Sequence, residues 1–259
     1  MVLTALEYTG GFIIGTMVGS FLNVVIHRVP RGESIVRPAS HCPHCRRPIK
    51  PWENIPILSY LALRGRCAGC GLPISIRYPA VEAAMGVVVV LLLHYYHWSV
   101  DLLFFGALAG VLLALSLIDI ATYRLPNRVV LTGAVMAVVL TLFLRREHLA
   151  SMVLGGLLGA AMLSLMGLIG TLLFRRPALG MGDIKLAGMI GLYLGPAKTA
   201  GMFVLGVFSA AIIGGGLLLI GGGGWRQRIP FGPHLALGAV VSLLWGGKLW
   251  SWYWALTIR

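Results

Sequence analysis

Long apolar stretches separated by short polar ones make up most of this 259-residue chain. About 20 residues of apolar helix, at a rise of 1.5 Å each, cross a hydrocarbon core of about 30 Å. The pattern predicts about eight membrane helices, with the sixth expected to be short and either tilted or continuous with the seventh. They are residues 10–27, 80–97, 101–118, 128–144, 150–174, 184–195, 198–221 and 233–254. We therefore expect an all-α integral membrane protein.

The segment between the first two apolar stretches differs from the rest of the chain. It is polar, rich in proline, and holds all four cysteines. We expect it to form a small separate domain. The chain then divides into a first transmembrane helix at 1–27, a loop domain at 28–79 and a transmembrane domain at 80–259.

Composition supports a membrane location and changes how the charge is interpreted. The mean hydropathy is +0.88 and 11% of residues are charged, against about 25% in a typical soluble domain. The net charge of +13 would suggest nucleic acid in a soluble protein. Here the basic residues gather in alternate loops, which is the pattern that membrane insertion produces. We expect contact with membrane lipid and no nucleic-acid partner.

The same basic residues predict an orientation in the membrane. Most of the 21 Lys and Arg residues fall on one side when an outside N-terminus is assumed, and Arg145 and Arg146 are exceptions. By the positive-inside rule, the basic side is cytoplasmic. The loop domain and the segments 119–128, 175–183 and 222–233 are then cytoplasmic, and the N-terminus is periplasmic.

The cysteines form two pairs with the spacing of a metal site. Cys42 and Cys45 make one C-x-x-C pair, and Cys67 and Cys70 make the other. Two such pairs at this separation are typical of four-thiolate zinc sites, in which a closed shell of ligands stabilises a small fold. The alternative is two disulfides, which an oxidising compartment would favour. His41 or His44 could also replace one cysteine as a ligand.

Two aspartates stand out among the eight acidic residues. Asp119, in LSLIDIATYRLPN, and Asp183, in GMGDIKLAG, each lie at the end of an apolar segment predicted to face the cytoplasm. A carboxylate there is costly unless it is used or paired. Two neighbouring carboxylates that share a proton supply one base and one acid, which suffices to hydrolyse a peptide bond with water.

Each aspartate also has a structural interpretation when taken alone. Asp119 could cap its helix or pair with Arg124, and Asp183 could be an N-cap. Around Asp183, Gly180 and Gly182 would let a substrate strand approach the acid. With these two glycines, Lys185 is expected to support the site, and it could pair with an acid or with a lipid headgroup.

The order of these motifs resembles the bacterial type IV prepilin peptidase family. The motifs GSFLNVVIHRVP, RPASHCPHC, a second C-x-x-C, RYPAVE, LIDIATYRLPN and GMGDIKLAGMIGLYLG run from Gly19 to Gly195. IPFGPHLALG, at 229–238, is similar to the family's C-terminal signature. The resemblance implies a GxGD aspartyl protease that cuts leaders from type IV prepilins or type II secretion pseudopilins at the bacterial inner membrane. It matches Asp119 and Asp183 with the two catalytic aspartates.

The resemblance also implies a second activity. Many members methylate the new N-terminus with S-adenosylmethionine, and the cysteine loop resembles that of these bifunctional members. Candidate residues for this activity, which could equally be structural, are Asn23, Arg77, Tyr78 and Glu82. The sequence contains no glycine-rich nucleotide-binding fold for the methyl donor. Asn127 stands where many relatives have an acid, so a third catalytic carboxylate is not expected there.

Other functions remain open from the residues alone. A peptidase without methyltransferase activity is one, and a scaffold of the pilus or secretion machinery is another. A proton-coupled transporter would also use acids within membrane helices, but it would place them near the midplane and show interrupted, repeated helices.

Overall fold

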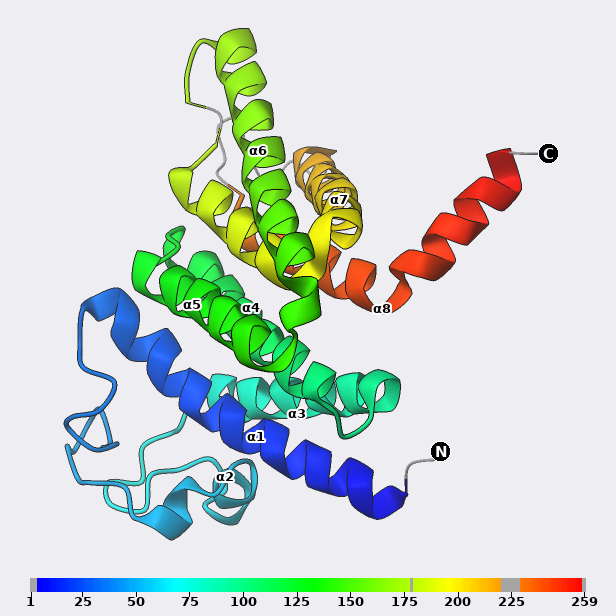
Figure 1. Cartoon of the computed structure of the whole chain (residues 1–259). Helices are drawn as coiled ribbons and strands as arrows, with labels where there is room; N and C mark the ends of the chain where they lie inside the picture. Colours follow the sequence, from blue (N-terminus) through cyan, green and yellow to red (C-terminus); the bar gives the residue numbers. More distant parts are fainter. Residues whose placement is uncertain (1–3, 178, 220–228, 258–259) are drawn as a thin grey trace. The chain divides into compact units, whose positions relative to one another are not determined.

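The computed structural model describes residues 4–177, 179–219 and 229–257, and their regular structure is helical. Two isolated β-bridges occur in the cysteine loop. This confirms the predicted all-α class. The helices, labelled in Figure 1, are α1 (Ala5–Arg28), α2 (Leu58–Ala62), α3 (Arg77–Tyr96), α4 (Val100–Thr122), α5 (Asn127–Leu144), α6 (Leu149–Phe174), α7 (Met181–Leu219) and α8 (Gly232–Thr257).

Seven helices in the described part of the chain are long and apolar enough to cross a membrane, and α2 is too short to be one of them. The expected helices 184–195 and 198–221 correspond to the two halves of α7, which meet at the non-helical residue Gly195. The short sixth helix is therefore continuous with the seventh across a kink, which is one of the two arrangements expected for it. The last described residue of α7 is Leu219. Residues 220 and 221 lie outside the described residues.

The chain divides into two compact units at Gly110, within α4. In the first unit, α1 packs closely against α3 along a stripe of small residues. A Cβ atom on Gly15 would lie 2.7 Å from the Gly86 Cα, and one on Gly19 would lie 2.7 Å from the Glu82 Cα. Small residues at such spacing let membrane helices approach backbone to backbone. This contact fixes the two helices that carry the ends of the cysteine loop.

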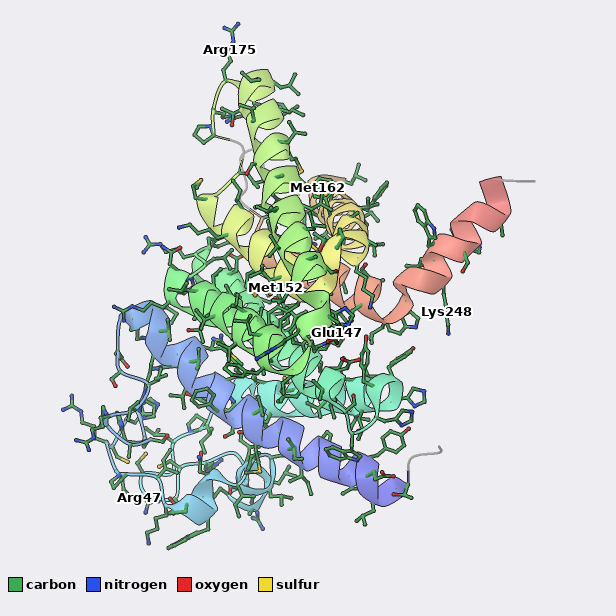
Figure 2. All side chains as sticks on the ribbon, viewed as in Figure 1. Arg47, Glu147, Met152, Met162, Arg175 and Lys248 are labelled. Carbon is green, nitrogen blue, oxygen red and sulfur yellow. The ribbon has the colours of Figure 1, made fainter. Side chains whose placement is uncertain are left out.

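In the second unit, α6 packs in the same way against α7. A Cβ atom on Gly155 would overlap the backbone of Gly191, and one on Gly159 would overlap the backbone of Ala187. The glycines at 155 and 159 therefore let the two helices pack backbone to backbone. Figure 2 labels Glu147 just before the start of α6 and Arg175 just after its end.

The helix α7 contains a break that reverses its direction, visible in Figure 1. Gly195 has φ 69° and ψ 174°, which is not helical, and Pro196 follows. The first half of α7 runs along α6, and the second half runs along α8, where a Cβ on Gly201 would lie 2.6 Å from the Ser242 Oγ. Because of this reversal, the starts of α7 and α8 lie at the same end of the second unit.

Candidate active site and metal centre

Asp119 lies in the last turn of α4 and is almost fully buried, with 5% of its surface exposed. Its Oδ2 accepts a hydrogen bond of 2.9 Å from the backbone N–H of Gly232, the first residue of α8. The structure records no ion pair between Asp119 and Arg124, which was one alternative interpretation of this residue. The partner is a backbone group of another helix, which holds one oxygen of the carboxylate in a fixed place.

Asp183 is the third residue of α7, within its first turn. The interpretation as an N-cap is wrong, because the helix has begun two residues earlier. The backbone N–H of Asp183 donates to the Gly180 carbonyl at 3.1 Å. A Cβ atom on Gly180 would lie 3.1 Å from the Asp183 Oδ2, so the missing side chain leaves room for the carboxylate.

The two aspartates are close enough to interact electrostatically. Leu125 packs at the same place: a Cβ on Gly182 would lie 3.2 Å from the Leu125 Cβ, and one on Gly232 would lie 3.4 Å from its Cδ2. The end of α4 and the starts of α7 and α8 therefore meet around one leucine. The structure thus brings together two acids that are far apart in the sequence.

The hydrogen bond recorded for Lys185 does not involve Asp119 or Asp183. Its Nζ donates to the Asn127 Oδ1 at 3.0 Å. The recorded partner is thus an amide oxygen and not an acid, and contact with a lipid headgroup stays a prediction. Asn127 is the first residue of α5, so this bond joins the starts of α5 and α7.

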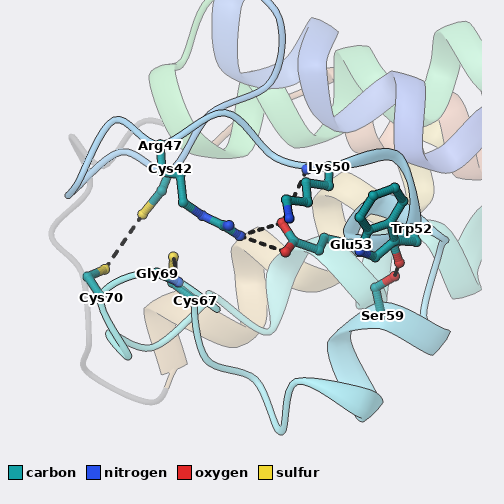
Figure 3. Close-up of polar contacts among 9 residues, drawn as sticks. All are labelled: Cys42, Arg47, Lys50, Trp52, Glu53, Ser59, Cys67, Gly69 and Cys70. Atoms are coloured by element: carbon teal, nitrogen blue, oxygen red, sulfur yellow. Dashed lines mark hydrogen bonds and ion pairs between the residues drawn. The ribbon is translucent and has the colours of Figure 1, made fainter.

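The four cysteine sulfurs converge in the first unit, in the loop between α1 and α3. All four cysteines are free, and their Sγ atoms lie within 4.8 Å of one another. The Sγ atoms of Cys42 and Cys70 are 3.9 Å apart, as the dashed line in Figure 3 marks. A tetrahedral Zn²⁺ with Zn–S bonds of about 2.3 Å needs sulfurs about 3.8 Å apart. The cluster therefore fits a four-thiolate metal and differs from the two-disulfide alternative.

Each C-x-x-C pair sits on a small hydrogen-bonded turn. The N–H of Cys42 donates to the Arg47 carbonyl at 2.9 Å, and the N–H of Cys67 donates to the Leu72 carbonyl at 2.8 Å. Hydrogen bonds from the backbone N–H groups of Cys70 and Gly69 lower the pKa of Cys67 to about 6. This favours the thiolate, the form that binds metal. The His41 Nδ1 is instead 3.1 Å from the Ala39 carbonyl.

A salt bridge links the first turn to the following segment. The Nη2 of Arg47 lies 2.6 Å from both carboxylate oxygens of Glu53 (Figure 3). This hydrogen bond from Arg47 lowers the pKa of the Glu53 carboxyl below its usual range. The Lys50 ammonium lies 5.3 Å from the centre of the Trp52 ring. A loop with few buried apolar residues is thus organised by its cysteine cluster and by polar contacts.

Comparison with known families identifies both units. Residues 13–96 match the bacterial peptidase A24 N-terminal domain, and residues 106–216 match the type IV leader peptidase family. The chain belongs to this family. A prepilin leader peptidase/N-methyltransferase of Pseudomonas putida is 33% identical over 92% of this chain and 91% of its own. One of Aeromonas hydrophila is 35% identical over 93% of this chain and 92% of its own.

A third relative with the same name, from Myxococcus xanthus, is 38% identical over 78% of this chain. The match spans 61% of that relative's own length. No solved structure matches the chain.

The candidate residues for methyl transfer in this leader peptidase family member lie where α1, α3 and the cysteine loop meet. The Asn23 Nδ2 donates to the Tyr78 carbonyl at 3.0 Å, and the Glu82 Oε2 accepts the N–H of Ile57 at 2.8 Å. Asn23 and Glu82 are both buried. Their recorded contacts tie the loop to the two helices. A role of these residues in methyl transfer stays a prediction.

Two residues near the acids were not singled out from the sequence. Gly232 holds Asp119, and Leu125 packs between the starts of α7 and α8. A signal for Gly232 was present, since it lies in the motif IPFGPHLALG and precedes a proline at the start of a helix. Nothing local marks Leu125, because its importance depends on contacts with distant helices.

Proposed function

We propose that this family member cleaves the leader of type IV prepilins or pseudopilins with Asp119 and Asp183 as its catalytic pair. The observation that supports the proposal is the meeting of three helix ends. The Gly232 N–H at the start of α8 donates to Asp119. Leu125 packs against both Gly232 and Gly182, the residue before Asp183. Neither aspartate belongs to an ion pair recorded for the described residues. A pair of acids without a cation is suited to sharing a proton and binding a water.

The geometry suggests how the pair works. One Asp119 oxygen accepts the Gly232 N–H, so its other oxygen is available to a water. The ionised carboxylate takes a proton as the water oxygen attacks the scissile carbonyl carbon. The protonated carboxyl then gives its proton to the amide nitrogen as the C–N bond breaks. The products are a leader with a new carboxylate and a pilin with a free N-terminal amine.

The metal centre has a separate role in this proposal. Cys42, Cys45, Cys67 and Cys70 would hold Zn²⁺ in a closed shell. Four protein ligands leave no position for water or substrate, so the metal would supply folding energy to the loop.

Methylation of the new N-terminal amine is the second part of the proposal. It rests on the names of the relatives, prepilin leader peptidase/N-methyltransferase. S-adenosylmethionine would supply an electrophilic methyl group to that amine. A product that gains the mass of one CH₂ only when this donor is present would support the second activity, and cleavage without that gain would leave a peptidase.

We also propose that the N-terminus is periplasmic and that the acids and the cysteine loop face the cytoplasm of the bacterial inner membrane. Support comes from the basic residues of the loop and of the segments next to the acids. A leader peptide that is still in the cytoplasm could then reach the acids.

The test is mass spectrometry of a prepilin peptide incubated with purified protein in detergent. Asp119→Asn and Asp183→Asn should each slow cleavage by more than about 10³-fold, since each removes one half of the acid–base pair. Asp101→Asn is the matched control, because Asp101 lies in the first turn of α4, at the end opposite Asp119.

Cleavage that survives both substitutions would overturn the catalytic assignment. Absence of cleavage by the unmodified protein would favour the scaffold or the proton-coupled transporter. Proton flux in reconstituted vesicles, lost in either variant, would identify the transporter.

A further inference from the structure

We propose that Ser209 and His234 are positioning residues for the cleavage reaction, because they hold the start of α8 so that the Gly232 N–H meets Asp119. This inference rests on the proposed function of Asp119. Neither residue touches the acid pair through a recorded contact. They act through the first turn of α8, which carries both Gly232 and His234.

The side chain of His234 points to α7. Its Nδ1 lies 3.1 Å from the Ser209 Oγ, and 6% of the histidine surface is exposed. The Ser209 hydroxyl donates to the Gly206 carbonyl at 2.9 Å. The Ser209 Oγ is therefore within hydrogen-bond reach of both the Gly206 carbonyl and the His234 Nδ1. When its one proton goes to the carbonyl, its oxygen accepts from a histidine that carries its proton on Nδ1.

The two helices are in close contact at this point, so the bond has little freedom. A Cβ atom on Gly206 would lie 3.3 Å from the His234 carbonyl, and one on Gly238 would lie 2.8 Å from the Gly206 nitrogen. The backbone of α8 thus lies directly on α7 around His234. Polar groups buried in such a contact specify one relative position of the two helices.

Gly232 is two residues before His234, and its N–H has no partner within its own helix because it is at the start. That N–H donates to Asp119. A small shift or rotation of the first turn would move the N–H away from the carboxylate. The Ser209–His234 bond prevents this shift, so Asp119 stays oriented before substrate arrives.

The test compares steady-state cleavage of a prepilin peptide by the full-length protein and its variants. Ser209→Ala and His234→Leu should each lower kcat by about tenfold, because misplacement of a catalytic group by a fraction of an ångström slows the chemical step. KM should change by less than about twofold, since substrate contacts are retained. The double variant should be no slower than the slower single variant, because both changes remove one bond. Ser209→Thr and His234→Asn keep an acceptor and a donor, and should recover most of the rate.

Ser242→Ala is the matched control. The Ser242 Oγ donates to the Lys198 carbonyl at 2.7 Å, which is also a buried α7–α8 hydrogen bond but lies toward the other end of the helix pair. This variant should lower the unfolding temperature as much as Ser209→Ala does and leave kcat unchanged.

The inference is overturned if Ser209→Ala and His234→Leu keep kcat, or if kcat falls equally in Ser242→Ala. Because Ser209→Ala removes only one oxygen, the test remains informative if His234→Leu does not fold. Failure of the proposed function would look different. The unmodified protein would not cleave the prepilin peptide, or the Asp119→Asn variant would still cleave it.

Discussion

At the scale of single residues, the acid pair depends on a position that must lack a side chain. A Cβ atom on Gly232 would lie 2.9 Å from the Asp119 Oδ2, closer than carbon and oxygen normally approach. The same residue supplies the N–H that holds this oxygen. Only glycine, which has no Cβ atom, lets the backbone donor come this close to the carboxylate.

Gly232→Ala should therefore lower the rate of leader cleavage by at least about tenfold, because Asp119 must rotate away from its donor. Gly247→Ala is the control, since a Cβ on Gly247 meets nothing within 4 Å. Initial rates measured at equal amounts of folded protein test this. Equal rates for the two variants would show that the close approach at Gly232 is not needed for catalysis.

At the scale of elements, the cysteine loop is held together by few contacts. The helix α2 has five residues, and the two cysteine turns make only one isolated β-bridge each. Trp52, Leu58 and Leu61 are exposed, so the loop has little apolar core. The cluster of four cysteines and the Arg47–Glu53 salt bridge stand in place of that core. Binding of metal and folding of the loop should then be one process.

The purified protein should contain one zinc per chain by elemental analysis. Cys42→Ser and Cys70→Ser should each lose most of it, because a tetrahedral site with three thiolates binds less tightly. His41→Ala is the control, since the His41 ring contacts a backbone carbonyl. Loss of zinc from His41→Ala would instead favour histidine as a ligand.

Chelation of the metal should make the loop sensitive to a protease while the membrane helices resist it. The reason is that α1 and α3 are packed through glycine contacts that do not involve the metal. Limited proteolysis with and without chelator, followed by mass spectrometry of the fragments, locates the cuts. Cuts within residues 32–76 alone fit this expectation, and an unchanged pattern would contradict it.

At the scale of the whole molecule, the second unit depends on the reversal within α7. Gly195 has a φ of 69°, and a Cβ atom there would overlap the Ser151 side chain on α6. The reversal is what returns the chain to the acids, since the starts of α7 and α8 both lie beside Asp119. One glycine therefore affects both the packing of α6 and the completeness of the site.

Gly195→Ala should lower the unfolding temperature in detergent, because φ 69° with ψ 174° is a backbone region essentially open only to glycine and costs another residue about 1–3 kcal/mol. The overlap with Ser151 adds to that cost. Gly215→Ala, on the same helix, has open space around its Cβ and should be tolerated. An unchanged unfolding temperature for Gly195→Ala would show that the reversal does not need glycine.

The orientation of the molecule can be tested with a membrane-impermeant maleimide applied to spheroplasts. A cysteine at Ser99, between α3 and α4, should be labelled, and one at Arg176, after α6, should not. The four native cysteines should also stay unlabelled until the membrane is broken. The reverse labelling pattern would place the acids and the loop outside the cytoplasm.

The sequence by itself determined the features that depend on short stretches of chain. Apolar length predicts a membrane span, and the C-x-x-C spacing predicts the thiolate cluster that the structure forms. The rarity of acids in apolar segments pointed to Asp119 and Asp183. These are local properties, since each is visible within about 20 residues of chain.

Only the tertiary structure decided which distant groups meet. Asp119 and Gly232 are 113 residues apart, and no local pattern joins them. The pairing of Lys185 with Asn127 was likewise beyond local reasoning, whereas the break of α7 at Gly195 falls where the sequence predicted one helix to end. In each case the outcome depends on how helices pack, and helix packing in a membrane follows from close contact between surfaces that lie far apart in the sequence.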